Sequence, residues 1–294
     1  MKIGVDCPEC LVHRGFIEIQ KATADEEKRL RVAIAVLKAI AENLNPDAVP
    51  GAIGTIRERV IRQETWNPDL YLQEKRISNI HALNLLPRIT EKIQRINDPL
   101  ERFRSIVRLS AIGNLVEFDI LGYSVRLDDL EAQIDNVKFG IDDSEETFKV
   151  ARSSKSALLL TDNAGEIVFD RLLVQELKRI GLSVTVAVKS APIMNDATFD
   201  DAVQAGMNGI ADEVITTGEA CVGLTLNDAS EDFHKRLNES DLVIAKGMGH
   251  YETMTERAWS QPILHVLIAK CRPIAMSLGV ERGQGAILLR RPKL

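Results

Sequence analysis

The sequence predicts an α/β fold: a mainly parallel sheet with flanking helices in three Rossmann-like layers, preceded by a helical region. From residue 156 onward, short runs of aliphatic and β-branched residues alternate with amphipathic stretches, as in successive βαβ units. Residues 1 to about 122 show only helical periodicity. We therefore expect an all-α N-terminal domain at 1–122 and an α/β domain at 123–294.

The helical region opens with two local patterns. Pro8 suits the first turn of a helix, and Thr23 with Glu26 forms a capping box before an amphipathic stretch. Further helices are expected at 56–62, 70–89 and 99–118. Pro87 lies inside the second of these segments and is expected to kink or end it.

Residues 123–155 form a transition in which we expect short helices at 127–134 and from Ser144 onward. Beyond it, strands are predicted at 157–160, 183–188, 213–216, 242–245, 263–268 and 286–289. The helix after the first strand has one apolar face and ends at Gly181, where a left-handed cap residue is expected.

Polar side chains gather directly after the predicted strands. Asp162 and Asn163 follow the first strand at a strand-to-helix turn. Lys189 and Asp196 follow the second strand, and Lys246 follows the fourth. Since right-handed crossovers place the carboxyl ends of parallel strands on one rim, these side chains should converge there. That rim is the candidate ligand site.

The three acidic and amide side chains at this rim favour a hard divalent cation. Asp162, Asn163 and Asp196 offer only oxygen ligands, which suit Mg²⁺ or Mn²⁺ far better than metals that prefer thiolate or imidazole. Mg²⁺ commonly takes one or two carboxylates, keeps several waters and binds phosphate oxygens of a substrate.

Two lysines and one further carboxylate complete the expected site. Lys189 and Lys246 could neutralise phosphate charge, together with amides at the start of the following helix. Glu166 could position or deprotonate a water molecule. The reaction that this set implies is metal-assisted hydrolysis of a phosphate monoester.

Each of these residues also has an ordinary structural explanation. Asp and Asn are favoured at turns because their side chains bond nearby backbone amides, and lysines are common on surfaces. Thr198 and Asp201 form a capping box, so Asp200 and Asp201 are interpreted as structural. The hypothesis of a site rests on the convergence of several candidates at successive strand ends.

Composition limits the classes of partner and compartment. The chain has 294 residues and a formal net charge of −6, which argues against general binding to nucleic acid or to an anionic membrane. The start, MKIGVDCPEC, has no apolar segment, so we expect no signal peptide. Four cysteines without a secretory signal indicate a reducing compartment, and we expect a cytoplasmic protein. The oligomeric state, a homo-oligomer included, is left open.

The cysteines are weaker candidates for a function. Cys7 and Cys10, even with His13, supply too few ligands for a closed structural zinc site. If they begin a helix, its N-terminus would lower the pKa of both thiols and permit a labile disulfide. We favour a packed or redox-responsive thiol pair over a bound metal, and expect Cys221 and Cys271 to be buried small hydrophobes.

Several short motifs, taken together, resemble the damage-control phosphatase family. They are TDNAGE at 161–166, the segment from Lys189 to Thr198, TTG at 216–218, KGMGHYE at 246–252 and KCRPIA at 270–275. The similarity continues into the helical region through the Gly113-Asn114 pair and CPEC at 7–10, which is similar to the microbial branch of the family. It therefore spans nearly the whole chain.

This resemblance implies a helical domain packed on an α/β domain that holds a divalent metal at Asp162, Asn163 and Asp196. Family members act on sugar phosphates, phosphopantetheine-like compounds or damaged phosphometabolites, usually with Mn²⁺, Co²⁺, Ni²⁺ or Mg²⁺. The resemblance also implies that further residues face the phosphorylated substrate: Asn114, Glu166, Lys246, His250 and Tyr251. His250 replaces the usual asparagine and Glu117 an expected aspartate, and both changes bear on substrate choice.

Other functions would require a different sequence in the turn after the first predicted strand. A nucleotide- or S-adenosylmethionine-dependent transferase should have a glycine-rich turn such as GxGxxG after the first strand, and a haloacid-dehalogenase-type phosphatase needs a second aspartate at Ala164. A non-catalytic module that binds phosphorylated metabolites would keep the phosphate contacts without turnover. Whether Asp162 only binds metal or also attacks phosphorus is left open.

Overall fold

The computed structural model describes residues 1–113 and 136–292. The helix expected at 127–134, the domain division at 122, and both Asn114 and Glu117 lie outside the described residues.

The described part of the chain contains one seven-stranded sheet, and the mainly parallel sheet predicted from the sequence is confirmed. Its strands are β1 (Phe139–Asp142), β2 (Ser156–Leu160), β3 (Ser183–Val188), β4 (Glu213–Thr216), β5 (Leu242–Lys246), β6 (Ile263–Ile268) and β7 (Gly285–Arg290). The spatial order is β1-β7-β6-β5-β2-β3-β4, and every neighbouring pair is parallel except β6 and β7. All six predicted strands are present, and β1 is a short edge strand that the sequence did not predict.

The strand order reverses beside β2. The chain leaves β2 for β3 and β4 on one side, then returns to the other side of β2 at β5. In open α/β sheets ligands bind outside the carboxyl ends of the strands at such a reversal. Asp162 follows β2 and Lys246 ends β5, so both lie at this point.

The central strands are buried on both faces. Leu159 and Ile244 face a core shared with α5 and α8, whereas Leu158 and Val243 face a second core on the opposite side. The helices of the α/β part are α7 (Ser144–Ser153), α8 (Glu166–Ile180), α9 (Phe199–Gln204), α10 (Glu231–Glu239), α11 (Gly247–Met254) and α12 (Arg272–Leu278). Helices on both faces give the three layers that the sequence predicts.

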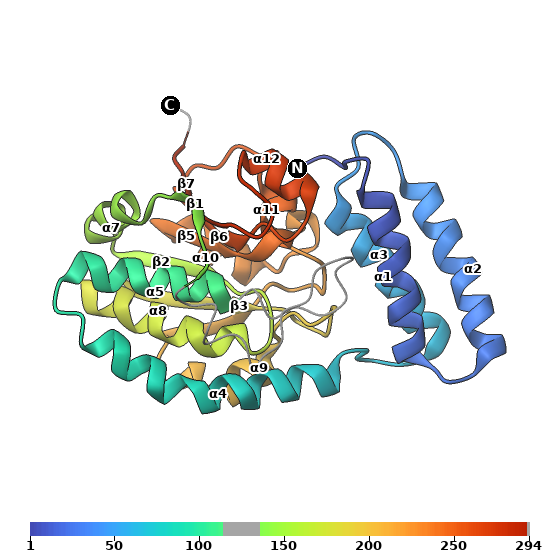
Figure 1. Cartoon of the computed structure of the whole chain (residues 1–294), viewed down its shortest axis with the longest axis horizontal. Coiled ribbons are helices and arrows are strands. Elements are labelled where there is room, and N and C mark those ends of the chain that lie inside the picture. Colours follow the sequence, from blue (N-terminus) through green and yellow to red (C-terminus); the bar gives the residue numbers. More distant parts are fainter. Residues whose placement is uncertain (114–135, 293–294) are drawn as a thin grey trace.

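The N-terminal helices serve two different cores. They are α1 (Cys7–Ala22), α2 (Glu26–Asn43), α3 (Pro50–Thr65), α4 (Leu72–Gln94) and α5 (Pro99–Gly113). Figure 1 shows α1, α2 and α3 as a separate group at one end of the molecule, where they share their own apolar core. α4 and α5 instead lie along α8 and cover the sheet.

Local expectations were met in part. Gly181 ends α8 with a φ of +113°, and the capping box of Thr198 and Asp201 is present, so both predictions are confirmed. The cap of α2 is Asp25, whose side chain accepts a hydrogen bond from the Lys28 amide at 3.0 Å; the predicted Thr23 box is wrong because the helix begins two residues later.

α4 continues through Pro87, so a break of the helix there is wrong, and the alternative, a kink, stays a prediction. Pro87 lies on the exposed side of the helix, while apolar side chains on either side of it pack against the main core and hold the helix in place. In the described ranges, no helix has the length and apolar content needed to span a bilayer.

Candidate functional site

The turn between β2 and α8 carries Asp162 and Asn163. Gly165 starts α8 with a φ of +79°, and its amide donates to Asn79 Oδ1 at 2.7 Å. A Cβ at Gly165 would lie 2.8 Å from the side chain of Ser78. This position therefore requires glycine, both for its backbone conformation and because a side chain would collide with Ser78. Asn79 of α4 holds the turn through its hydrogen bond to the Gly165 amide.

The loop between β3 and α9 brings Asp196 to the same place. Asn163 and Asp196 form an isolated antiparallel bridge, and the Ala197 amide donates to Asp162 O at 2.7 Å. Backbone hydrogen bonds thus set the spacing of the three oxygen-bearing residues.

These three residues line a cavity of about 390 Å³. The rest of the described wall comes from α1, α3, α11, the start of α12 and the loop before α10, and includes Cys10, Arg14, Gly54, Val222, Met248 and Arg272. The cavity therefore lies between the strand ends and the α1–α3 group, and its size suits a small organic ligand.

Gly247 allows the backbone of α11 to approach Asp162 closely. Its φ is +77°, and a Cβ at this position would lie 1.9 Å from Asp162 Oδ2. Only glycine fits here, so the glycine after Lys246 in the KGMGHYE motif has a direct physical explanation.

A buried network of charges lies beneath the β2–α8 turn. Lys246 Nζ donates to Glu166 Oε1 at 2.5 Å, to Asp170 Oδ1 at 2.8 Å and to Ser110 O at 3.0 Å. Burial favours the neutral amine, but the charges of Asp170 and Glu166 outweigh it and raise the pKa of Lys246. Burial also raises the pKa of Asp170. Lys246 is thus a cation held by two carboxyl groups.

Glu166 links this network to Asn163. The Asn163 side-chain nitrogen donates to Glu166 Oε2 at 3.2 Å and to Asp162 Oδ2 at 3.0 Å. These bonds orient the amide so that its nitrogen faces the carboxylates, and its oxygen is the atom that a cation would bind.

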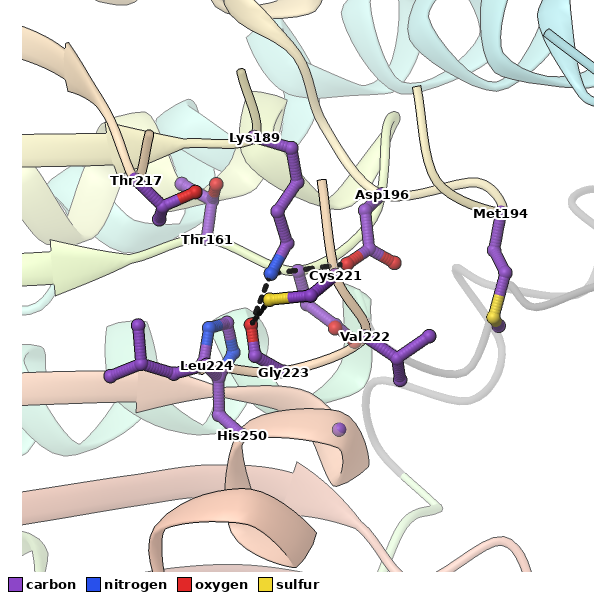
Figure 2. Close-up of polar contacts among 12 residues, drawn as sticks. Thr161, Lys189, Met194, Asp196, Thr217, Cys221, Val222, Gly223, Leu224 and His250 are labelled. Carbon is purple, nitrogen blue, oxygen red and sulfur yellow. Dashed lines mark hydrogen bonds and ion pairs between the residues drawn. The ribbon is translucent and has the colours of Figure 1, made fainter. Parts of the chain in front are cut away.

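Lys189 lies behind Asp196. Figure 2 shows its ammonium group between Gly223 and Asp196: Nζ donates to Gly223 O at 2.5 Å and lies 3.5 Å from Asp196 Oδ2. Lys189 is 2% exposed and is not part of the described cavity wall. In this structure it ties the β3 end to the loop that contains Cys221 to Leu224.

His250 and Tyr251 are also buried away from the described cavity wall. His250 Nδ1 lies 2.7 Å from Lys246 O, and burial followed by the charge of Lys189 lowers the pKa of His250 well below its usual value. The Tyr251 hydroxyl lies 2.9 Å from Ser277 Oγ. The structure brings these two residues close to the site residues without exposing them to the cavity, and Asn114 lies outside the described residues.

The donor set fits a hard cation only if Asn163 takes part. Across residues 1–113 and 136–292, no cluster of three or more His, Cys, Asp or Glu side chains could hold a metal ion. Asp162 and Asp196 supply two carboxylates, and Asn163 supplies an oriented amide oxygen. Two carboxylates with an amide, completed by water or phosphate oxygens, match the coordination habits of Mg²⁺ and Mn²⁺.

Three of the four cysteines line the same cavity. Cys7 and Cys10 lie in the first turn of α1, Cys271 precedes α12, and Cys221 is buried elsewhere; all four are thiols. Burial raises the pKa of Cys7, opposite to the lowering expected from its helix terminus, and raises the pKa of Cys271 to about 12. Cys221 is buried as predicted. Cys271 packs against an apolar cluster but is only half-buried, because it also lines the cavity.

Sequence reasoning missed Asp170 and Ser110. Asp170 stands one helical turn after Glu166, so the pair shares a face of α8, and this spacing could have identified it as a second carboxyl for Lys246. Ser110 donates from its hydroxyl to Asp170 at 2.6 Å but comes from α5, and no local pattern connects the two.

The fold and this oxygen-rich site at the strand reversal define the class of protein. The chain belongs to the damage-control phosphatase ARMT1-like domain family, whose model matches residues 3–285.

Particular relatives are similar over their full length. A damage-control phosphatase of Archaeoglobus fulgidus is 34% identical over 286 residues, which cover 96% of this chain and 97% of the relative. A damage-control phosphatase of Pyrococcus horikoshii is 32% identical over 298 residues and is covered completely, as is this chain. The crystal structure of a DUF89 family protein from Pyrococcus horikoshii matches all of both chains with a TM-score of 0.88 at 31% identity.

Proposed function

We propose that this protein is a divalent-metal-dependent phosphatase that hydrolyses small phosphate monoesters in metabolite repair. Candidate substrates are sugar phosphates, phosphopantetheine-like compounds and damaged phosphometabolites. The observation that carries the proposal is the convergence of Asp162, Asn163 and Asp196 on one cavity at the strand reversal. The names of the relatives, which are damage-control phosphatases, support the same reaction class.

Asp162, Asn163 and Asp196 would hold the cation, with Mn²⁺, Mg²⁺, Co²⁺ or Ni²⁺ as candidates. Such an ion polarises a phosphoryl group and makes bound water more acidic. Asp162 and Asp196 both line the cavity, and a catalytic role of Asp162 beyond metal binding stays a prediction. Glu166 would not bind the cation itself but would orient the Asn163 amide that does.

The two lysines support the site electrostatically in this proposal. Lys246 offsets the charges of Glu166 and Asp170, and Lys189 lies beside Asp196. Both ammonium groups are buried. In this proposal Lys189 stabilises the charge of the ligand Asp196, and Lys246 stabilises the carboxyl groups behind Asn163. Direct contact of Lys189, His250 or Tyr251 with substrate stays a prediction, as does a cytoplasmic location.

The test is phosphate release from a panel of sugar phosphates, phosphopantetheine and p-nitrophenyl phosphate. Each substrate is assayed in EDTA and with each of the four metals, using wild type, Asp162→Ala and Asp196→Ala. Asp200→Ala is the control, because Asp200 is an exposed carboxylate that lies just after the loop that carries Asp196. We expect hydrolysis only with metal, and a loss of more than about 100-fold in the two variants but not in the control.

Wild type that binds phosphate esters equally well in EDTA and with metal, and releases no phosphate under any condition, would instead identify a non-catalytic binding module.

A further inference from the structure

The loop that carries Asp196 is held by a distant part of the chain. Ile193 and Met194 of this loop pack into the core of α1, α2 and α3. Figure 2 shows Met194 on the same loop as Asp196. Met194 has a φ of +47°, a left-handed conformation that is unfavourable for a side chain with a Cβ. A methionine keeps this conformation only when its surroundings hold it there.

Glu58 of α3 provides that restraint. Its Oε2 accepts a hydrogen bond from the Met194 backbone amide at 2.6 Å, and both residues are buried. Other α3 side chains add contacts to the same loop: Arg62 Nη1 donates to Pro192 O at 2.6 Å, and Arg57 Nη2 lies 3.9 Å from the Met194 sulfur.

The burial of Glu58 is not explained by the helical region itself. Glu58 is 1% exposed, and its Oε1 has no hydrogen-bond partner among the described residues. Arg57 directs its guanidinium to Glu18 through two bonds of 2.8 and 2.6 Å. Burial and then the charge of Glu18 raise the pKa of Glu58, which marks the position as unfavourable for a carboxylate. The Met194 amide, followed by the charges of Arg57 and Arg62, opposes this shift, so the bond to Met194 is a main contact that favours the buried carboxylate.

We propose that Glu58 is a positioning residue for the metal site: by fixing the Met194 backbone it sets Asp196 against Asp162. The link is short, because the Asp196 amide donates to Ile193 O at 3.1 Å within the same turn. The inference rests on the proposed divalent-metal site. It means that the helical region supports a site whose three proposed ligands all lie in segments that follow strands of the sheet.

The first experiment measures Mn²⁺ affinity by isothermal titration calorimetry. Glu58→Ala should weaken binding about 10–100-fold, as expected when a residue that supports a metal ligand is removed. Glu58→Gln keeps an acceptor oxygen and should weaken it only about fivefold. Glu64→Ala is the control, because Glu64 is exposed on the same helix, and it should match wild type.

A second comparison separates positioning from a general loss of stability. Glycine adopts a positive φ without penalty, so a Met194→Gly background should need Glu58 less. The loss of Mn²⁺ affinity caused by Glu58→Ala should be at least about fivefold smaller when residue 194 is glycine. An equal loss in both backgrounds would overturn the proposed route through the Met194 backbone.

Hydrogen–deuterium exchange without metal distinguishes this inference from the proposed function. Glu58→Ala should raise the exchange rate of segment 190–197 about tenfold or more, and Glu64→Ala should not. Wild type that binds none of Mn²⁺, Mg²⁺, Co²⁺ and Ni²⁺, with faster exchange in Glu58→Ala, would refute the metal site but support the restraint by Glu58. Unchanged exchange and unchanged Mn²⁺ affinity in folded Glu58→Ala would overturn the inference.

Discussion

The two loops that meet at the site owe their conformations to different parts of the chain. The β2–α8 turn is short, and its course follows from Gly165, from the immediate start of α8 and from Asn79 of α4, which accepts a hydrogen bond from the Gly165 amide. The β3–α9 loop, from Lys189 to Thr198, is held by Glu58, which stands 136 positions before the residue it binds. One half of the site therefore depends on a tight turn packed against α4, and the other half on a longer loop packed against α3.

The comparison shows what the α1–α3 group contributes to the site in this chain. A metal ligand needs a fixed backbone, and a tight turn into a helix provides one at Asp162. The ten-residue β3–α9 loop has only isolated backbone bridges, at Lys189 with Thr198 and at Asn163 with Asp196, so Asp196 relies in addition on the α1–α3 core around Ile193 and Met194. Variants that affect one loop and spare the other can test this difference.

The largest effect on stability should come from the buried charges beneath the β2–α8 turn. Lys246→Met would leave Glu166 and Asp170 buried without their cation, and we expect a loss of about 3–5 kcal/mol in the free energy of unfolding. Urea denaturation at neutral pH measures it. Lys149→Met is the control, because Lys149 is an exposed lysine that also contacts two carboxylates, and it should cost about 0.5 kcal/mol or less. Equal losses would contradict a role for the buried network.

Alanine substitutions at two glycines with positive φ can distinguish backbone strain from displacement of the proposed metal ligand Asp162. Gly247→Ala would place a Cβ against Asp162 Oδ2, whereas Gly181→Ala has no atom within 4 Å of its Cβ. The left-handed backbone alone should cost each variant about 1–2 kcal/mol of stability, and Gly247→Ala should lose more because its Cβ overlaps Asp162. Only Gly247→Ala should weaken Mn²⁺ binding, about 10–100-fold, as measured by calorimetry. Normal Mn²⁺ affinity in Gly247→Ala would show that Asp162 does not need its observed position.

Acid should lower the stability of the sheet from which both loops emerge, and this effect should not distinguish the two loops. Burial, then the charge of Arg290, lowers the pKa of His265 to about 3. The unfolded chain therefore binds one more proton between about pH 6.5 and 3, and stability is lost as pH falls through this window. At pH 5 the loss from His265 is about 2 kcal/mol.

His265→Leu should remove this loss because leucine does not bind a proton. The substitution breaks no hydrogen bond, since neither ring nitrogen of His265 has a partner among the described residues. The measurement is the difference in urea stability between pH 7 and pH 5, with His81→Gln, at an exposed position, as control. An unchanged difference in His265→Leu would show that His265 does not titrate as its burial indicates.

The sequence was sufficient for the parts of the molecule that depend on local patterns. Short aliphatic runs identified the strands, since parallel strands are buried on both faces. Asp162 and Asn163 were found because a strand, a polar turn and a helix follow one another directly. Asp196 was found because parallel topology places successive strand ends on one rim.

The sequence could not show which polar residues at that rim face the cavity. Lys189 and Lys246 stand at strand ends much as Asp162 does, yet both are buried outside the described cavity wall. Whether a side chain points into a cavity depends on what packs over it, and this comes from distant elements. Glu58 illustrates the limit, because nothing near it in sequence indicates its contact with Met194.

The smallest predicted effect concerns a second restraint on the distant loop. Arg62 donates to Pro192 O, four residues before Asp196, whereas Glu58 acts two residues before it. One hydrogen bond to a backbone carbonyl contributes about 1 kcal/mol, and part of that is lost over the intervening residues. Arg62→Ala should therefore weaken Mn²⁺ binding about threefold, less than Glu58→Ala.

Arg59→Ala is the matched control for this change, because Arg59 is an exposed arginine of the same helix whose carboxylate partner is Glu219. It should leave Mn²⁺ affinity unchanged in the same calorimetric titration. The double variant Glu58→Ala/Arg62→Ala should lose less affinity than the product of the two single losses, since both side chains restrain one loop. Fully multiplicative losses would mean that the two residues act on separate structures, and the loop could then not be treated as one unit held by α3.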